Sequence, residues 1–410
     1  MGGFETLVSG LGRRIEHRVL PSCARPSRNG GKRIRKELQD LFQHQLVQLA
    51  YILHRNSISI ASQRTMSFSR TSIFFTGATG YIGGSVLYRL LQHPSAKTFN
   101  ITVLVRSQEK AKKLESFGVK TAIGSLDDHA LVEELTLKAH VTFNTADSDN
   151  VEAIRAILRG AQKRHATVGD LPIYIHTSGT AELADGDALG NKTTEVIWDD
   201  SNVEQVESIP DAAFHRNVSL EVIAADKAGY VKSYIILPST IYGRVKNPLV
   251  DAGIQNPQSI QIPYLIKAAL GRKQAGMVGK GVALWADVSN DDIADLYIAL
   301  YDAIVANPDK VGHGREGYYY GENGEHTWYS ISRAIGEALV ALGVSKDPEP
   351  TSFTDDELIK YYGSLMFGNF NGTNARCRAN RGRSIGWKPK YTSQDMLASI
   401  KPEVEAIAKQ

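Results

Sequence analysis

Three glycines stand three residues apart in the segment Thr76-Gly77-Ala78-Thr79-Gly80-Tyr81-Ile82-Gly83, between two apolar patterns. The short apolar run 73–75 precedes the segment, and apolar residues with helical spacing follow it over 86–91. A chain that turns sharply out of a strand and lets a diphosphate approach closely cannot carry Cβ atoms at the contact points. The N-terminus of the following helix then offers free N–H donors to the diphosphate. We therefore predict a nicotinamide-dinucleotide site. Its loop residues are Gly77, Thr79, Gly80, Tyr81, Ile82 and Gly83.

The choice between the two nicotinamide dinucleotides is expected at the end of the second strand, about twenty residues after the glycines. An acid at this place holds the ribose 2′-OH, whereas an arginine accepts a 2′-phosphate. The sequence there is Leu104-Val105-Arg106-Ser107. Because a guanidinium makes charge-assisted bidentate contacts to phosphate and a serine adds a hydroxyl donor, Arg106 and Ser107 predict NADP(H) over NAD(H).

Apolar runs alternate with helical patterns after Met66, which is typical of repeated βαβ units. Such alternation predicts an α/β fold with a doubly wound parallel sheet covered by helices on both faces. After Pro238 the chain becomes rich in loops, and we predict a smaller C-terminal substrate lobe interleaved with the last strands, to which we assign 318–320 as a strand. The domains are expected at 66–247 for the cofactor and 248–410 for most of the substrate lobe. The strands are predicted at 101–105, 119–123, 141–143, 173–175 and 234–237.

Residues 1–65 differ from the rest of the chain, because they are rich in arginine and poor in acids. We predict a basic, unstructured extension, with Met66 as an alternative start. A cytoplasmic location is expected. A mitochondrial location is the alternative if the extension is a transit peptide, although Glu5 and Glu16 argue against that function.

Composition excludes several classes of protein. The formal charge of +3 over 410 residues does not indicate a nucleic-acid surface, and 42% hydrophobic residues suffice for a large core. Cys23 and Cys377 are too few and too far apart to suggest a disulfide framework or a zinc site. No apolar run reaches the length of a membrane span. The acids Asp291 and Asp292 are expected to lie at a helix N-terminus, and no metal site is predicted.

Several motifs together resemble the extended short-chain dehydrogenase/reductase superfamily, in its atypical epimerase/dehydratase-like and NmrA-like branch. They are the glycine loop, Asn144-Thr145-Ala146, His176-Thr177-Ser178-Gly179-Thr180, Pro238-Ser239-Thr240-Ile241-Tyr242-Gly243 and the segment 286–294. The resemblance covers the chain from about Ser72 to the C-terminus. It implies a Rossmann domain, NAD(P) binding with Ala146 and Pro238 beside the cofactor, and a substrate cleft next to the nicotinamide.

The catalytic positions depart from the family pattern. Active members use a tyrosine as proton donor, a lysine four residues later, and a serine or threonine that binds the substrate oxygen. The window in which the tyrosine and lysine are expected is Ala213-Phe214-His215-Arg216-Asn217, which contains neither. We assign the proton or the positive field to His215 or Arg216, and the contact to the substrate oxygen to Ser178 or Thr180.

These features predict an NAD(P)-dependent oxidoreductase that acts on an aldehyde or ketone as its small-molecule substrate. One alternative is a nucleotide-sugar epimerase or dehydratase, for which Arg376, Arg378, Arg381 and Arg383 could grip the anion; a solvated loop is the other interpretation of this run. Another alternative is a catalytically silent dinucleotide sensor. The sequence is compatible with a monomer or a homodimer.

Overall fold

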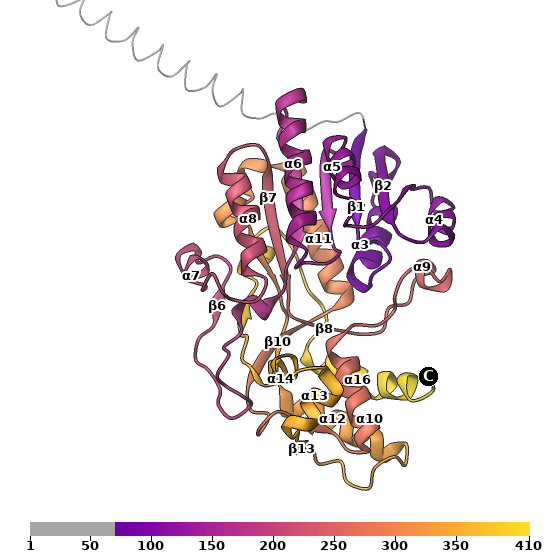
Figure 1. Cartoon of the computed structure of the whole chain (residues 1–410), viewed down its shortest axis with the longest axis vertical. Coiled ribbons are helices and arrows are strands. Elements are labelled where there is room, and N and C mark those ends of the chain that lie inside the picture. Colours follow the sequence, from indigo (N-terminus) through magenta and orange to yellow (C-terminus); the bar gives the residue numbers. More distant parts are fainter. Residues whose placement is uncertain (1–69) are drawn as a thin grey trace, which may run out of the picture. The chain divides into compact units, whose positions relative to one another are not determined.

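The computed structural model describes residues 70–410, which form a Rossmann-type α/β unit (Figure 1). The predicted basic extension and the alternative start at Met66 lie outside the described residues. Seven strands make one sheet in the order β11-β7-β5-β4-β1-β2-β3, and every neighbouring pair is parallel. The strands are β1 (Thr71–Thr76), β2 (Phe99–Val105), β3 (Lys120–Ile123), β4 (Val141–Asn144), β5 (Ile173–Thr177), β7 (Lys232–Pro238) and β11 (Tyr318–Gly321).

Helices connect the strands of this sheet and cover both of its faces. Helix α5 packs on α6 and α6 packs on α8, whereas α3 packs on α11. The strand order reverses between β1 and β4, and right-handed crossovers on either side of that point place helices on opposite faces. The predicted doubly wound fold is therefore confirmed. The helices are α3 (Tyr81–Gln92), α4 (Gln108–Glu115), α5 (His129–Leu137), α6 (Val151–Val168), α8 (Arg216–Lys227) and α11 (Asn290–Ala306).

The core lies between the sheet and these helices. Phe75 of β1 stacks on Phe143 of β4 with ring centroids 5.5 Å apart, and both side chains are fully buried. Val86, Leu87 and Leu90 of α3 are also fully buried. Each such side chain contributes about 1.5–3 kcal/mol of hydrophobic stabilisation. The packing fixes β1 and α3 against the sheet, and with them the glycine loop that joins the two.

The C-terminal part builds a second, smaller layer beside the carboxyl ends of the main strands (Figure 1). Its three-stranded sheet has the order β12-β10-β8. The elements of this part are β8 (Thr240–Tyr242), α9 (Pro248–Asp251), α10 (Gln261–Arg272), β10 (Leu284–Ser289), β12 (Glu325–Thr327), α12 (Trp328–Ala341), α13 (Asp355–Tyr362), α14 (Leu365–Asn369), α15 (Asn380–Ser384) and α16 (Ser393–Ile407). Shorter elements are β6 (Trp198–Asp199), α7 (Val203–Glu207), β9 (Gly276–Met277), β13 (Thr351–Ser352) and β14 (Cys377–Arg378).

One predicted strand lies in a different sheet from the one expected. The tyrosine run 318–320 is a strand, β11, but it pairs with β7 at the edge of the main sheet and not within the C-terminal part. Its three tyrosines are almost completely buried. The chain thus returns to the main sheet after α11, so the sequence boundary at 247 does not separate the two sheets.

Helix α11 begins as the sequence predicts. Ser289 caps it by accepting the backbone N–H of Asp292 at 3.0 Å, and Asp291 and Asp292 lie in its first turn. Asp291 also pairs with Arg89 of α3 at 2.8 Å. Within residues 70–410 no group of three or more His, Cys, Asp or Glu side chains is arranged to hold a metal ion.

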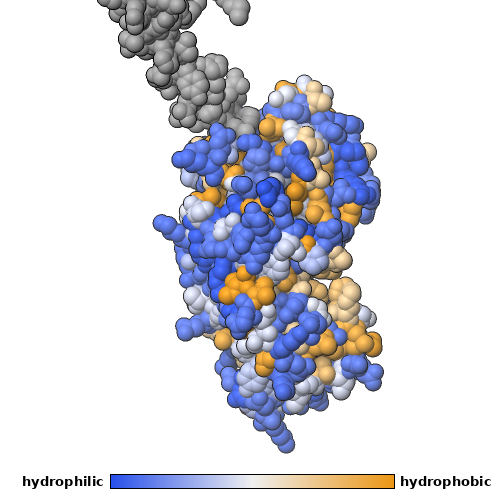
Figure 2. All heavy atoms as spheres, turned by 90° about the vertical axis from the view of Figure 1, so that its left-hand side faces the viewer, coloured by the Kyte–Doolittle hydropathy of each residue, from blue (hydrophilic) through white to orange (hydrophobic). Residues whose placement is uncertain are grey.

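The surface in Figure 2 is mainly hydrophilic, and its apolar areas are separated by charged and polar side chains. None of the helices between residues 70 and 410 combines the length and the apolar character that a membrane span requires.

Candidate active site

The glycine loop between β1 and α3 has the close packing that the sequence predicts. Gly77 has φ +78°, and a Cβ on it would lie 2.5 Å from the carbonyl carbon of Thr145. A Cβ on Gly83 would lie 2.2 Å from Thr145 Oγ1. Gly80 precedes α3, whose N-terminus has neither a side-chain cap nor an acid in its first turn. The first N–H groups of α3 are therefore left for an anion, as a dinucleotide requires.

The variant Gly83→Ala tests this packing. The added methyl group meets Thr145 Oγ1 at 2.2 Å and Gly77 O at 2.3 Å, so the loop must move. Such overpacking costs about 1–3 kcal/mol, and we expect dinucleotide affinity to fall roughly 5- to 100-fold in a fluorescence titration. Gly186→Ala is the matched control, because a Cβ there has no atom within 4 Å. Unchanged affinity in Gly83→Ala would contradict the assignment.

A first cavity, of about 400 Å³, extends from the glycine loop to the end of β2. Arg106 lines it, is exposed, and makes no hydrogen bond or ion pair with another residue of the described chain. Ser107 instead caps α4 by accepting Lys110 N at 3.3 Å. Lys110 Nζ donates to the carbonyl of Ile254 at 3.0 Å. Arg106 keeps all its donors for a ligand, and Ser107 keeps its hydroxyl hydrogen because its oxygen is the acceptor in the cap, whereas Lys110 has already used one of its donors.

A second cavity, of about 540 Å³, continues from the first. The two share Gly80, Thr145, Ala146 and Asp147, so they form one groove along the carboxyl ends of β1, β4 and β5. This edge, where the strand order reverses, is where open α/β sheets bind ligands.

The predicted cofactor residues occupy different parts of this groove. Tyr81, Ile82 and Ala146 line the second cavity, and Thr79 lines the first. Pro238 ends β7 and pairs with Gly321. Its neighbours Ser239 and Ile241 line the second cavity in its place.

Tyr81 is held by the protein itself. Its hydroxyl donates to the carbonyl of Gly243 at 2.5 Å. Burial raises the pKa of the Tyr81 phenol well above its ordinary value. This tyrosine is therefore a packing residue that joins α3 to the C-terminal part and is unsuited to act as a proton donor.

Of the predicted hydroxyls, Ser178 lines the cavity. Its Oγ donates to Glu182 Oε2 at 3.1 Å, which fixes the side chain in the wall. Thr180 is 1% exposed, and its Oγ1 has no partner among the described residues. Because Thr180 does not line the cavity, Ser178 is the better placed hydroxyl.

Arg216 lies in a buried ion pair. Its guanidinium donates to Glu182 at 3.0 Å, to the Tyr318 hydroxyl at 2.6 Å and to the Val206 carbonyl at 3.2 Å. Its side chain is 3% exposed and that of Glu182 is fully buried. A charge neutralised in this way supplies little positive field to the cavity, so the geometry gives Arg216 a structural place. Glu182, which the sequence did not single out, connects Arg216 to Ser178.

His215 lies at the start of α8, with the left-handed backbone angle φ +67°. Its Nδ1 is 2.5 Å from Asp149 Oδ1 and 3.5 Å from the Oγ of Ser148, which lines the second cavity. A Cβ on Gly179 would lie 3.4 Å from His215 Nε2. The missing side chain of Gly179, next to Ser178, therefore leaves room for the imidazole. Bonding of Nδ1 to a carboxylate orients the ring, as in acid–base dyads.

Asp149 is a partner that the sequence analysis missed. The signal was the polar run Asp147-Ser148-Asp149-Asn150 directly after β4, at the ligand-binding edge of the sheet. The residue four positions after His215 is Ser219, which is buried and donates to Glu182 at 2.9 Å. No lysine occupies the place of the family's lysine on α8.

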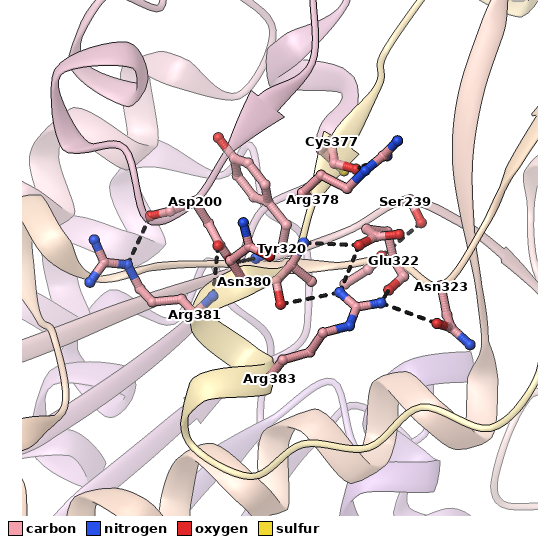
Figure 3. A network of polar contacts seen from close by, with 12 residues as sticks. Asp200, Ser239, Tyr320, Glu322, Asn323, Cys377, Arg378, Asn380, Arg381 and Arg383 are labelled. Atoms are coloured by element: carbon pink, nitrogen blue, oxygen red, sulfur yellow. Dashed lines mark hydrogen bonds and ion pairs between the residues drawn. The ribbon is translucent and has the colours of Figure 1, made fainter.

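The C-terminal arginines are bound within the protein, as Figure 3 shows for Arg381 and Arg383. Arg383 contacts Glu322 at 2.7 Å, and the backbone and Nε of Arg381 donate to Asp200 at 2.8 Å. Arg376 and Arg378 both pair with Glu325, at 3.0 and 3.1 Å. The interpretation as a solvated loop is wrong, because much of the run lies in β14 and α15 and is held by these contacts. The interpretation as an anion grip loses three of its four arginines to acids, whereas the guanidinium of Arg381 bonds to the backbone carbonyl of Asp200 and to no carboxylate of residues 70–410.

Asp200, in the same network, makes stability depend on pH. Burial raises the pKa of this carboxyl to about 7. The folded state therefore holds the proton more tightly than the unfolded chain, and this stabilisation is lost as pH rises through about 7. We expect the Tm of the wild type, relative to Asp200→Asn, to fall between about pH 5 and pH 8 in thermal melts. A Tm difference between the two proteins that stays constant with pH would refute this expectation. Asp211→Asn, at an exposed position, serves as the control.

Comparisons with known proteins agree with the fold. Residues 69–166 match the model of the NmrA-like family. The oxidase ucsJ of an Acremonium species is 29% identical over 334 residues, which cover 77% of this chain and 92% of its own. A 4-hydroxy-2-methyl-3-oxo-4-farnesyl-3,4-dihydroquinoline-1-oxide ketoreductase of Stigmatella aurantiaca is 31% identical over 123 residues, 28% of this chain and 36% of its own.

Among solved structures, the UDP-glucose 4-epimerase of Thermotoga maritima aligns with a TM-score of 0.54 and 13% identity, over 82% of this chain and 99% of its own. A dTDP-glucose 4,6-dehydratase of Bacillus anthracis, solved with NAD, aligns with a TM-score of 0.54 and 18% identity, over 83% of this chain and 97% of its own. At such identities these neighbours share the fold. The predicted resemblance to NmrA-like proteins is supported over residues 69–166, and the solved neighbours share the predicted Rossmann-type fold.

Proposed function

We propose that this protein is an NADP(H)-dependent oxidoreductase that reduces or oxidises an aldehyde or ketone carbonyl. The observation that carries the proposal is the single groove of two cavities. At one end lies Arg106, which has no partner among residues 70–410, and at the other lies Ser178, with the His215–Asp149 pair close by. The relatives named as an oxidase and a ketoreductase support the reaction class.

The residues along the groove fit a dinucleotide. Gly77 and Gly83 let the loop pack closely on Thr145, Gly80 lines both cavities, and the uncapped N-terminus of α3 supplies donors. Arg106 is assigned to the 2′-phosphate, because it lines the cavity and makes no ion pair with an acid of residues 70–410. When bound, the dinucleotide supplies or accepts the hydride.

The chain itself provides proton transfer and orientation. In the direction of reduction, the Ser178 hydroxyl turns its one hydrogen from Glu182 Oε2 to the carbonyl oxygen of the substrate. His215 Nε2 gives the proton that turns this oxygen into a hydroxyl. Asp149, as a positioning residue, holds Nδ1 and stabilises the imidazolium before the transfer.

A catalytically silent sensor is the second candidate, and one observation favours it. The family's tyrosine and lysine are both absent from the start of α8, where His215 and Ser219 stand four residues apart. A nucleotide-sugar epimerase or dehydratase has weaker support, because the C-terminal arginines are paired with Glu322 and Glu325.

The test has two steps. The protein is first titrated with NADPH to measure binding, and the decrease in NADPH absorbance is then measured with a panel of aldehydes and ketones. The proposal expects tight binding of NADPH and turnover of at least one carbonyl compound. Tight binding without turnover across the panel favours the sensor, and no binding refutes both.

A further inference from the structure

The second cavity differs from the first in its charge. Fifteen residues line it, and the one charged side chain among them is the carboxylate of Asp147. Among residues 70–410 no lysine or arginine lines this cavity, and Arg376 and Arg383 are paired elsewhere. An anionic substrate would therefore give up its hydration and meet the like charge of Asp147 without a lysine or arginine to pair with.

The wall nevertheless offers hydrogen bonds to a neutral molecule. Ser259 lines the cavity, and its Oγ is buried without a partner among residues 70–410. Gln261 also lines the cavity, and its Oε1 accepts from Thr240 at 2.8 Å, which leaves its amide nitrogen as a donor. A buried hydroxyl without a partner costs free energy, and a ligand that bonds to it recovers that cost.

Apolar side chains complete the cavity. Ile82 and Ile241 line it, and Ile260 lines it while leaving 71% of its side chain exposed. Phe214 is 39% exposed and its ring lies 4.1 Å from that of His215. A large aliphatic residue so exposed beside a cavity offers an apolar contact to a bound molecule.

We propose that the second cavity selects a neutral, largely apolar carbonyl compound that carries a second polar group, which Ser259 and Gln261 hydrogen-bond. This inference rests on the proposed function for the identity of the reacting carbonyl. The binding preference itself does not depend on turnover. It assigns substrate selection to the segment 256–261, which lies against the glycine loop through the bond from Asn256 N to Thr79 O at 3.0 Å.

The test compares a matched pair of compounds that differ in charge. Methyl benzoylformate is a neutral keto ester, and benzoylformate is the corresponding acid. Their affinities are measured by calorimetry on the full chain saturated with NADP⁺, with UDP-glucose as a third probe. We expect the ester to bind about tenfold or more tightly than the acid and UDP-glucose. Equal or tighter binding of either anion, or no binding of the ester, overturns the inference.

The variant Ser259→Ala tests the polar contact. We expect the ester to bind roughly 5- to 10-fold more weakly, with NADP⁺ affinity unchanged. Ser95→Ala is the matched control, because Ser95 lies exposed in a turn and its hydroxyl makes no cap bond. If Ser259→Ala binds the ester as the wild type does, the assignment of Ser259 fails.

Turnover separates this inference from the proposed function. An ester that binds selectively but consumes no NADPH, together with an inactive carbonyl panel, refutes the oxidoreductase while the selection by charge stands. Turnover of the acid at the rate of the ester confirms the oxidoreductase and refutes the selection.

Discussion

The variant His215→Ala is expected to lose most of the activity while it keeps its cofactor. A positioned general acid contributes about 10²- to 10⁴-fold to a rate, so kcat is expected to fall by that factor. Because His215 lies near Ser178 and not at the first cavity, the Kd for NADPH is expected to remain within about twofold of the wild type. Stopped-flow and steady-state rates, with a fluorescence titration, measure both quantities.

The backbone at His215 requires a second variant. Its φ of +67° is unfavourable for alanine, whereas asparagine tolerates this region. His215→Asn is therefore expected to fold as the wild type does and to be as inactive as the alanine variant. Asp149→Asn is expected to lower kcat with little change in KM, since Asp149 acts through the imidazole. Wild-type kcat in His215→Asn would exclude the histidine as proton donor.

The variant Arg106→Asp is expected to reverse the cofactor preference. The change removes a guanidinium that has no partner within the described chain and places an acid at the end of β2. Charge-assisted contacts are worth about 1.5–3 kcal/mol, so NADPH affinity is expected to fall roughly 10- to 100-fold while NADH affinity rises. Binding of both dinucleotides is measured by fluorescence titration.

Lys112→Asp is the control for this charge change, because Lys112 is exposed on α4 and does not line the first cavity. Its effect on NADPH binding is expected to be small and to disappear at high salt. If Arg106→Asp binds NADPH as tightly as the wild type, the assignment of Arg106 to the 2′-phosphate is wrong.

The fold was predictable where local patterns decide it. The strand of each βαβ unit is a short apolar run bounded by a helical pattern, and the five predicted strands from 101–105 to 234–237 all lie in the main sheet. The tyrosine strand β11 shows what local patterns cannot predict, which is the strand that it pairs with. Its apolar pattern predicts a strand, but its partner β7 precedes it by some eighty residues and is fixed by tertiary packing.

The candidate site, like the fold, has one part that local sequence spacing predicts and another that depends on tertiary contacts. The glycine loop and Arg106 lie at fixed distances along one βαβ unit, so spacing identifies them. The pairing of His215 with Asp149 joins residues 66 positions apart, and the ion pair of Arg216 with Glu182 joins residues 34 positions apart. No local pattern distinguishes His215, whose ring approaches Gly179, from Arg216, whose guanidinium is neutralised by a buried acid.

The most direct measurement for the central claim is the transfer of deuterium to the carbonyl carbon of a product alcohol from NADPH that carries deuterium at both positions of nicotinamide C4. The full chain is incubated with this cofactor and each active aldehyde or ketone, and the product is analysed by mass spectrometry. We predict one deuterium on the former carbonyl carbon with the wild type and none above background with His215→Asn. A protein that binds the cofactor but transfers no deuterium to any compound of the panel would contradict the account.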